Sequence, residues 1–115
     1  MLFVIVGLDR PKDGAALRRA TRATHLEFLT RNPGIVRNGG ALRAEDGSMA
    51  GSLMIVDVPD RAALDRFLAE EPYCRSGLYE PRIVMPYREV IPEPTPGFLA
   101  KELAGEAAKA GAAPR

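Results

Sequence analysis

Apolar and polar positions divide the chain into strand-like and helix-like stretches. Residues 2–8 form a continuous apolar run, rich in β-branched side chains, that stops at Asp9-Arg10-Pro11. A short run without polar positions predicts a strand covered on both faces, and therefore a central strand. Residues 49–58 alternate instead, which predicts a strand whose two faces carry different side chains. We expect Ser52, Met54, Val56 and Val58 on one face and Leu53, Ile55 and Asp57 on the other.

Two stretches have the spacing of amphipathic helices. The first is predicted from Asp13-Gly14 to Arg31, where Asn32-Pro33-Gly34 ends it because proline cannot continue a helix. The second is predicted to begin after Asp60, a suitable N-cap, and to end at Glu71-Pro72-Tyr73. The expected apolar stripes are Leu17, Thr21, Thr24 and Phe28 on the first helix and Ala63, Leu64, Phe67 and Leu68 on the second.

Two further strands complete the pattern. Residues 35–43 predict a strand interrupted by Gly39-Gly40, and the Asp46-Gly47 pair that follows is typical of a hairpin turn. Residues 79–91 predict the last strand. This strand is expected at an edge or bulged position, because it contains two residues without a backbone donor, Pro81 and Pro86.

The resulting order of elements, β-α-β-β-α-β, predicts an α+β fold of the ferredoxin-like type. Both helices should cover one face of a four-stranded antiparallel sheet. The other face also carries apolar side chains, and nothing else in the chain is left to cover it. We therefore expect a homodimer in which two sheets face each other.

The predicted domain spans residues 1–91, and the tail, residues 92–115, differs in composition. The tail opens with three prolines and ends in a stretch rich in alanine and glycine. A short helix is expected within it at 98–109, docked on the domain or on a partner subunit. The last few residues are expected to be disordered.

Composition and charge narrow the class of protein. A chain of 115 residues fits a single domain. Its formal net charge of +1, without a basic patch, argues against nucleic acid as a partner. The single cysteine, Cys74, rules out an internal disulfide, and no set of spaced ligands predicts a metal site. The sequence has neither a leader-like segment nor the roughly 20 apolar residues of a membrane span, so we expect a cytoplasmic protein.

His25 is the only histidine and the first candidate for chemistry, because imidazole exchanges protons near neutral pH. On the predicted helix it flanks the apolar stripe, which suits the lip of a cleft between helix and sheet. A boundary histidine without a role would have the same spacing. Glu71, beside Tyr73, could orient an imidazole or bind a polar substrate, and a solvated helix end is the alternative.

Other residues are candidates for substrate binding. Gly39-Gly40 could bring backbone N–H groups close to a ligand oxygen, or could form a purely structural bulge. Arg22, Arg37 and Arg43 could bind an anion, although arginine is common on protein surfaces. Cys74 has no activating neighbour in the sequence and is expected to fill space at a loop.

Six segments occur in an order that is familiar from one protein family. They are Arg22-Ala23-Thr24-His25-Leu26, Asn38-Gly39-Gly40-Ala41-Leu42, Asp46-Gly47, Glu71-Pro72-Tyr73, Gly77-Leu78-Tyr79 and Val84-Met85-Pro86-Tyr87. With these segments the chain resembles the YCII-related (YciI-like) family over residues 1–91. The resemblance implies a ferredoxin-like domain that dimerises into an α+β barrel.

The resemblance also implies an active site built around a histidine and an acidic residue. The histidine corresponds to His25. The acidic residue of the family's Asp-Pro-Tyr segment corresponds to Glu71, whose side chain is one methylene longer. Asp46 is an alternative acidic partner.

These residues lead to the hypothesis of a cofactor-independent lyase or isomerase that acts on a small anionic or carbonyl-bearing metabolite. His25 would move the proton, and Glu71 or Asp46 would orient the imidazole. Arg22, Tyr73 and the Gly39-Gly40 backbone would hold the substrate, and the sequence contains no cofactor motif. A non-catalytic module for metabolite binding or dimerisation is the alternative. A cofactor-free monooxygenase of the same architecture ranks lower.

Overall fold

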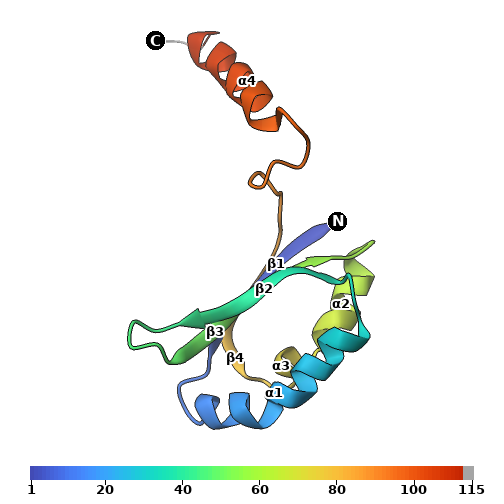
Figure 1. The fold of residues 1–115 in the computed structure, drawn as a ribbon, viewed down its shortest axis with the longest axis vertical. Coiled ribbons are helices and arrows are strands. Elements are labelled where there is room, and N and C mark those ends of the chain that lie inside the picture. The colour runs from blue at the N-terminus through green and yellow to red at the C-terminus, as the bar shows by residue number, and fades with distance from the viewer. Residues whose placement is uncertain (113–115) are drawn as a thin grey trace.

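The strands form one antiparallel sheet, and α1, α2 and α3 lie on one side of it (Figure 1). This computed structural model describes residues 1–112. The strands are β1 (Leu2–Asp9), β2 (Val36–Arg43), β3 (Met49–Asp57) and β4 (Tyr79–Pro86). The helices are α1 (Gly14–Arg31), α2 (Arg61–Glu70), α3 (Pro72–Arg75) and α4 (Phe98–Ala112).

β1 lies inside the sheet, whose strand order is β2-β3-β1-β4. It pairs antiparallel with β3 on one side and with β4 on the other, as its continuous apolar run predicts. β4 is an edge strand, in agreement with its two prolines. The element order and the antiparallel sheet confirm the ferredoxin-like α+β fold.

The hydrophobic core lies between the sheet and the helices. Side chains along β1 and β3 alternate, so that Phe3, Ile5, Met54 and Val56 are buried against the helices. Leu64 and Phe67 of α2 pack in the same cluster. The α2 N-terminus is fixed as the sequence predicts, because the Asp60 carboxylate accepts a hydrogen bond of 2.8 Å from the backbone N–H of Ala63.

The opposite side of the sheet carries apolar side chains that no element of residues 1–112 covers. We call this surface the outer apolar face. Register and alternation assign to it Val4, Val6, Leu8, Leu53, Ile55, Ile83 and Met85. Ile83 and Met85 on β4 are 52% and 56% exposed, which is unusual for large apolar residues that share one face.

Two boundaries differ from the sequence-based expectation. The last strand ends at Pro86 instead of residue 91, because the hydrogen bond from the Tyr87 N–H to the Leu2 carbonyl, 2.9 Å long, is the final contact with β1. The Glu71-Pro72-Tyr73 segment does end α2, but it then starts the short helix α3, in which Pro72 takes the first position that proline favours.

The inward face of α1 is also rotated from the predicted stripe. Thr24 is exposed, whereas Arg18 is 6% exposed and His25 is half-buried. The predicted stripe selected residues by polarity. Polarity alone assigns an arginine to the surface, so Arg18 could be placed inward only if its ionic partner, Asp9, were known.

α4 follows a proline-rich linker and projects away from the rest of the molecule (Figure 1). The radius of gyration is 17.9 Å, against about 13 Å for a compact domain of similar length. The expected disorder of the last few residues concerns 113–115, which lie outside the described residues. No helix within residues 1–112 is both long and apolar enough to cross a membrane.

Candidate functional site

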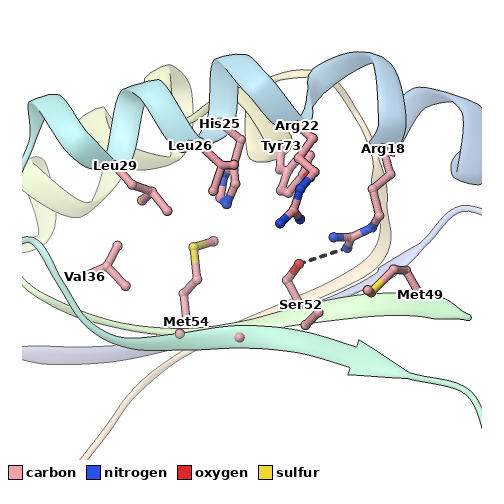
Figure 2. Close-up of a pocket in the computed structure, with 13 residues that line it drawn as sticks. Arg18, Arg22, His25, Leu26, Leu29, Val36, Met49, Ser52, Met54 and Tyr73 are labelled. Carbon is pink, nitrogen blue, oxygen red and sulfur yellow. Dashed lines mark hydrogen bonds between the residues drawn. The ribbon is translucent and has the colours of Figure 1, made fainter. Parts of the chain in front are cut away.

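A cavity of about 340 Å³ opens between α1 and the strands β2 and β3 (Figure 2). Five residues that the sequence singled out line it together: Arg22, His25, Gly39, Gly40 and Tyr73. The remaining lining residues are Arg18, Leu26, Leu29, Val36, Ala41, Met49, Ser52 and Met54. Polar groups from α1 and α3 therefore face a mostly apolar wall from the two strands.

The central contact of the site joins His25 on α1 to Glu71 at the start of α3. The Nδ1–H of His25 donates a short hydrogen bond to Oε1 of Glu71. The Glu71 side chain is fully buried, and that of His25 is 12% exposed. Figure 2 shows the imidazole pointing from α1 into the cavity. Since Nδ1 is occupied by Glu71, the nitrogen left for a ligand is Nε2.

Glu71 is held at both carboxylate oxygens. While Oε1 binds His25, Oε2 accepts a hydrogen bond of 2.9 Å from the backbone N–H of Cys74. This second bond caps α3, so the local fold and the site use the same side chain. The longer glutamate thus spans the distance to the imidazole while it also caps a helix.

The charge state of Glu71 follows from these contacts. Burial by itself would raise the pKa of Glu71, but the hydrogen bonds from His25 and from the Cys74 backbone outweigh it, and the pKa lies below its ordinary value. An ionised carboxylate can only accept hydrogen bonds, so the proton of a neutral His25 ring resides on Nδ1. Nε2 then carries a free lone pair that faces the cavity.

Tyr73 forms one wall of the cavity and fixes the plane of the imidazole. Its ring stacks on His25, with 4.0 Å between ring centroids and 18° between planes. The guanidinium carbon of Arg18 lies 4.8 Å from the centroid of the same ring. The Tyr73 hydroxyl is buried and has no hydrogen-bond partner among residues 1–112.

Arg18 is a site residue that the sequence reasoning missed. Its guanidinium donates two hydrogen bonds to Asp9 at the end of β1, of 2.6 and 2.8 Å, and one of 2.9 Å to the Ser52 hydroxyl on β3. The hydrogen bond to Asp9 raises the pKa of Arg18, against the opposing effect of burial. A signal was present, because Arg18, Arg22 and His25 are spaced four and three residues apart on one face of a helix.

The charges of the two arginines at the cavity differ in availability. Arg18 is neutralised by Asp9, whereas Arg22 is exposed and takes part in none of the ion pairs within residues 1–112. Figure 2 shows the Arg22 side chain directed toward the cavity, beside Arg18. Of the two arginines at the cavity, Arg22 is therefore the one whose charge no carboxylate within residues 1–112 compensates.

At Gly39, strand β2 lines the cavity with backbone atoms alone. Gly39 pairs with Met54, and a Cβ atom at Gly39 would lie only 3.2 Å from Cγ1 of Val36. The absence of a side chain therefore leaves backbone accessible to a ligand beneath α1.

Several predicted candidates lie elsewhere. Asp46 is in the β2–β3 hairpin, where its carboxylate accepts hydrogen bonds from the backbone and hydroxyl of Ser48, so it is not the acidic partner of His25. Arg37 pairs with Glu89, and Arg43 donates to the Gly47 carbonyl in the hairpin. Both arginines are engaged in local contacts outside the cavity.

Two further observations concern a cysteine nucleophile and a metal site. Cys74 is buried, and burial raises the pKa of its thiol, which makes it a poor nucleophile. Within residues 1–112 no group of three or more histidine, cysteine, aspartate or glutamate side chains is arranged to hold a metal ion.

Comparisons with known proteins agree with this architecture. A family model described as the YCII-related domain matches residues 1–88. Among solved structures, the chain is similar to 5-chloro-2-hydroxyhydroquinone dehydrochlorinase (TftG) from Burkholderia phenoliruptrix AC1100, in complex with 2,5-dihydroxybenzoquinone. The identity is 26% and the TM-score 0.68, over 77% of this chain and 95% of that one.

A second similar structure is an antibiotic biosynthesis monooxygenase. It is 22% identical with a TM-score of 0.51, over 78% of this chain and 99% of that one. This likeness shows the fold alone. No protein with curated annotation matches the chain.

Proposed function

The chain belongs to the YCII-related family, and from this premise we propose that it is a small-molecule enzyme in which His25 acts as a general base and acid. The observation that carries the proposal is the buried Glu71–His25 pair, which leaves Nε2 facing a cavity. A carboxylate that orients an imidazole and stabilises its protonated form is a recurrent arrangement in acid–base catalysis.

The proposed reaction is a proton transfer. Nε2 of His25 accepts a proton from an O–H or acidic C–H group of the substrate, and the electron pair stays on the substrate. The substrate anion then either expels a leaving group, as in a lyase, with the imidazolium passing its proton to that group or to solvent, or takes the proton back at another atom, as in an isomerase. Glu71 stabilises the imidazolium between these steps, and Arg22 stabilises the substrate anion.

The substrate that fits this description is a small anionic or carbonyl-bearing compound about as large as a single six-membered ring. A cavity of about 340 Å³ lies at the lower end of the range for small-molecule sites. The similar dehydrochlorinase holds 2,5-dihydroxybenzoquinone, a flat ring with oxygen substituents. Arg22, the backbone at Gly39-Gly40 and the ring of Tyr73 would hold such a compound against the apolar wall.

We further propose that the protein works as a homodimer. The outer apolar face exposes large apolar side chains to water, and the same face of a second subunit would bury them. This arrangement would leave the cavity, which lies on the helix side, open to substrate.

Turnover of chlorinated and non-chlorinated hydroxyhydroquinones tests the enzymatic proposal. Wild-type protein is expected to convert at least one compound, and His25→Gln and Glu71→Gln are each expected to lower kcat by about 100-fold or more. Glu70→Gln is the matched control, because Glu70 is the exposed neighbour in sequence and lies outside the cavity.

The same experiment separates catalysis from binding alone. Thermal stabilisation by a compound that is never converted would point to a binding module, because a bound ligand stabilises by mass action without turnover. Equal turnover by wild type and by His25→Gln would exclude the proposed mechanism.

A further inference from the structure

α4 and its linker, residues 87–97, form an arm that lies almost wholly outside the family match. The family match ends at residue 88, and the similar dehydrochlorinase aligns over 95% of its own length but only 77% of this chain. The arm ends in the fifteen-residue helix α4. The arm is therefore not part of the segment that the chain shares with the family model.

The arm is ordered by its own contacts. Arg88 binds Glu102 and lies over the ring of Phe98, 5.2 Å from its centroid. The backbone N–H of Leu99 donates a hydrogen bond of 2.9 Å to Glu93. These contacts join the first turns of α4 to the linker.

One side of α4 is apolar and has no cover within residues 1–112. Leu99 and Leu103 are one turn apart and are 39% and 71% exposed. Ala107 and Ala110 continue the same stripe, which is therefore two leucines followed by small residues. Lys101 and Lys109 lie on the other side of the helix, and Glu102 and Glu106 border the stripe.

The arm leaves the domain on the side of the outer apolar face. In Figure 1, α1, α2 and α3 lie on one side of the sheet and α4 projects from the other. The linker is anchored across the sheet, since Glu89, which follows the edge strand β4, pairs with Arg37 on the opposite edge strand β2 at 3.2 Å. The linker therefore leaves the domain at the rim of the outer apolar face.

We propose that α4 is a clasp for a second copy of this chain, and that Leu99 and Leu103 pack on the partner subunit. α4 and the outer apolar face lie on the same side of the molecule (Figure 1), so a single partner seated there can reach both. In a two-fold dimer each subunit both gives and receives a clasp. The inference rests on the homodimer proposed above and adds a second, independent contact to it.

Sedimentation equilibrium of the full chain tests the clasp. Leu103→Gln and the double variant Leu99→Gln, Leu103→Gln are expected to raise the dimer Kd by about tenfold or more, since each removes buried apolar surface. Lys101→Gln, on the polar side of the same helix, is the matched control and should change the Kd by less than twofold. A photo-reactive residue at position 103 should yield a covalent dimer, and one at position 101 should not.

Failure of the clasp and failure of the dimer give different results. Ile83→Lys places a charge on the outer apolar face and is expected to yield monomers. If Ile83→Lys dissociates the dimer while the leucine variants leave its Kd unchanged, the dimer stands and the clasp is wrong. If the wild-type chain is monomeric, or position 103 cross-links only within one chain, the clasp is also wrong.

Discussion

Tyr73 lies flat on His25, with 4.0 Å between ring centroids, yet its hydroxyl is buried without a partner among residues 1–112. The ring therefore packs against the imidazole, whereas the hydroxyl makes no hydrogen bond within the described residues. A buried polar group left unpaired costs about 1–3 kcal/mol, so its removal relieves a penalty instead of deleting a bond.

We expect Tyr73→Phe to keep the stack and to raise the free energy of unfolding by up to about 1 kcal/mol. Tyr73→Ala removes the ring and should lower it by about 3–5 kcal/mol, as for other large buried side chains. Urea denaturation of both variants measures the difference. A Tyr73→Phe variant that is clearly less stable than wild type would mean that the hydroxyl is hydrogen-bonded in solution.

The pH dependence of stability reports on Glu71. Folding lowers the pKa of Glu71, so the unfolded chain binds this proton more tightly than the folded one. The stabilisation is therefore complete above the unfolded-state pKa of about 4.3 and is lost as the pH falls through the lower folded-state pKa. Free energies of unfolding from pH 7 to pH 3 should decline steeply in the acid range.

Glu71→Gln should flatten that decline, and Glu70→Gln should leave it unchanged, because only Glu71 is buried. Denaturation curves at each pH provide the test. Identical acid slopes for wild type and Glu71→Gln would contradict the assignment of the charge to Glu71.

Removing only one partner of the Arg18–Asp9 ion pair should destabilise the fold more than removing both, because the remaining charge is buried without a counterion. Both side chains are buried, at 7% and 8% exposure. Arg18→Met leaves the Asp9 carboxylate without its cation, and we expect a loss of about 3–5 kcal/mol in the free energy of unfolding. The double variant Asp9→Asn, Arg18→Met should recover at least half of that loss. A double variant no more stable than Arg18→Met would show that packing, not charge, dominates at this position.

Gly51 sits where two strands approach closely. A Cβ atom there would lie 2.2 Å from the backbone oxygen of Gly7 on β1. Gly51→Ala must therefore push β3 away from β1, and we expect a loss of at least about 2 kcal/mol. Gly40→Ala is the control, because its Cβ would meet no atom within 4 Å and should change stability by less than about 0.5 kcal/mol. Thermal melting of the two variants compares them directly.

Much of the fold could be predicted from local pattern. The apolar run of β1, the turn at Asp46-Gly47 and the cap at Asp60 each involve residues that are close in sequence, so their signals are complete in the sequence alone. The boundary of β4 could not be read in this way. It depends on where Tyr87 stops pairing with Leu2, and those two residues are far apart in the chain.

In the candidate site, too, the residue types could be predicted from the sequence, whereas the long-range contacts could not. Residue type and resemblance point to Glu71 and His25, but their contact joins positions 46 residues apart and leaves no local pattern. Arg18 was missed because its burial depends on Asp9 and Ser52, which belong to different strands. Asp46 was a reasonable acidic candidate by type, yet its hairpin holds it on Ser48. Long-range pairing of polar groups leaves little trace in hydrophobic periodicity.

The two prolines of β4 affect which edge of the sheet is open to aggregation by strand addition. An exposed sheet edge is a template on which another strand can add, and repeated addition leads to aggregation. Pro81 and Pro86 have no N–H to offer, so the edge formed by β4 presents an interrupted row of donors. The opposite edge, β2, contains no proline. If misfolded chains accumulate by strand addition, growth should start from β2, and a proline placed within 36–43 should slow it.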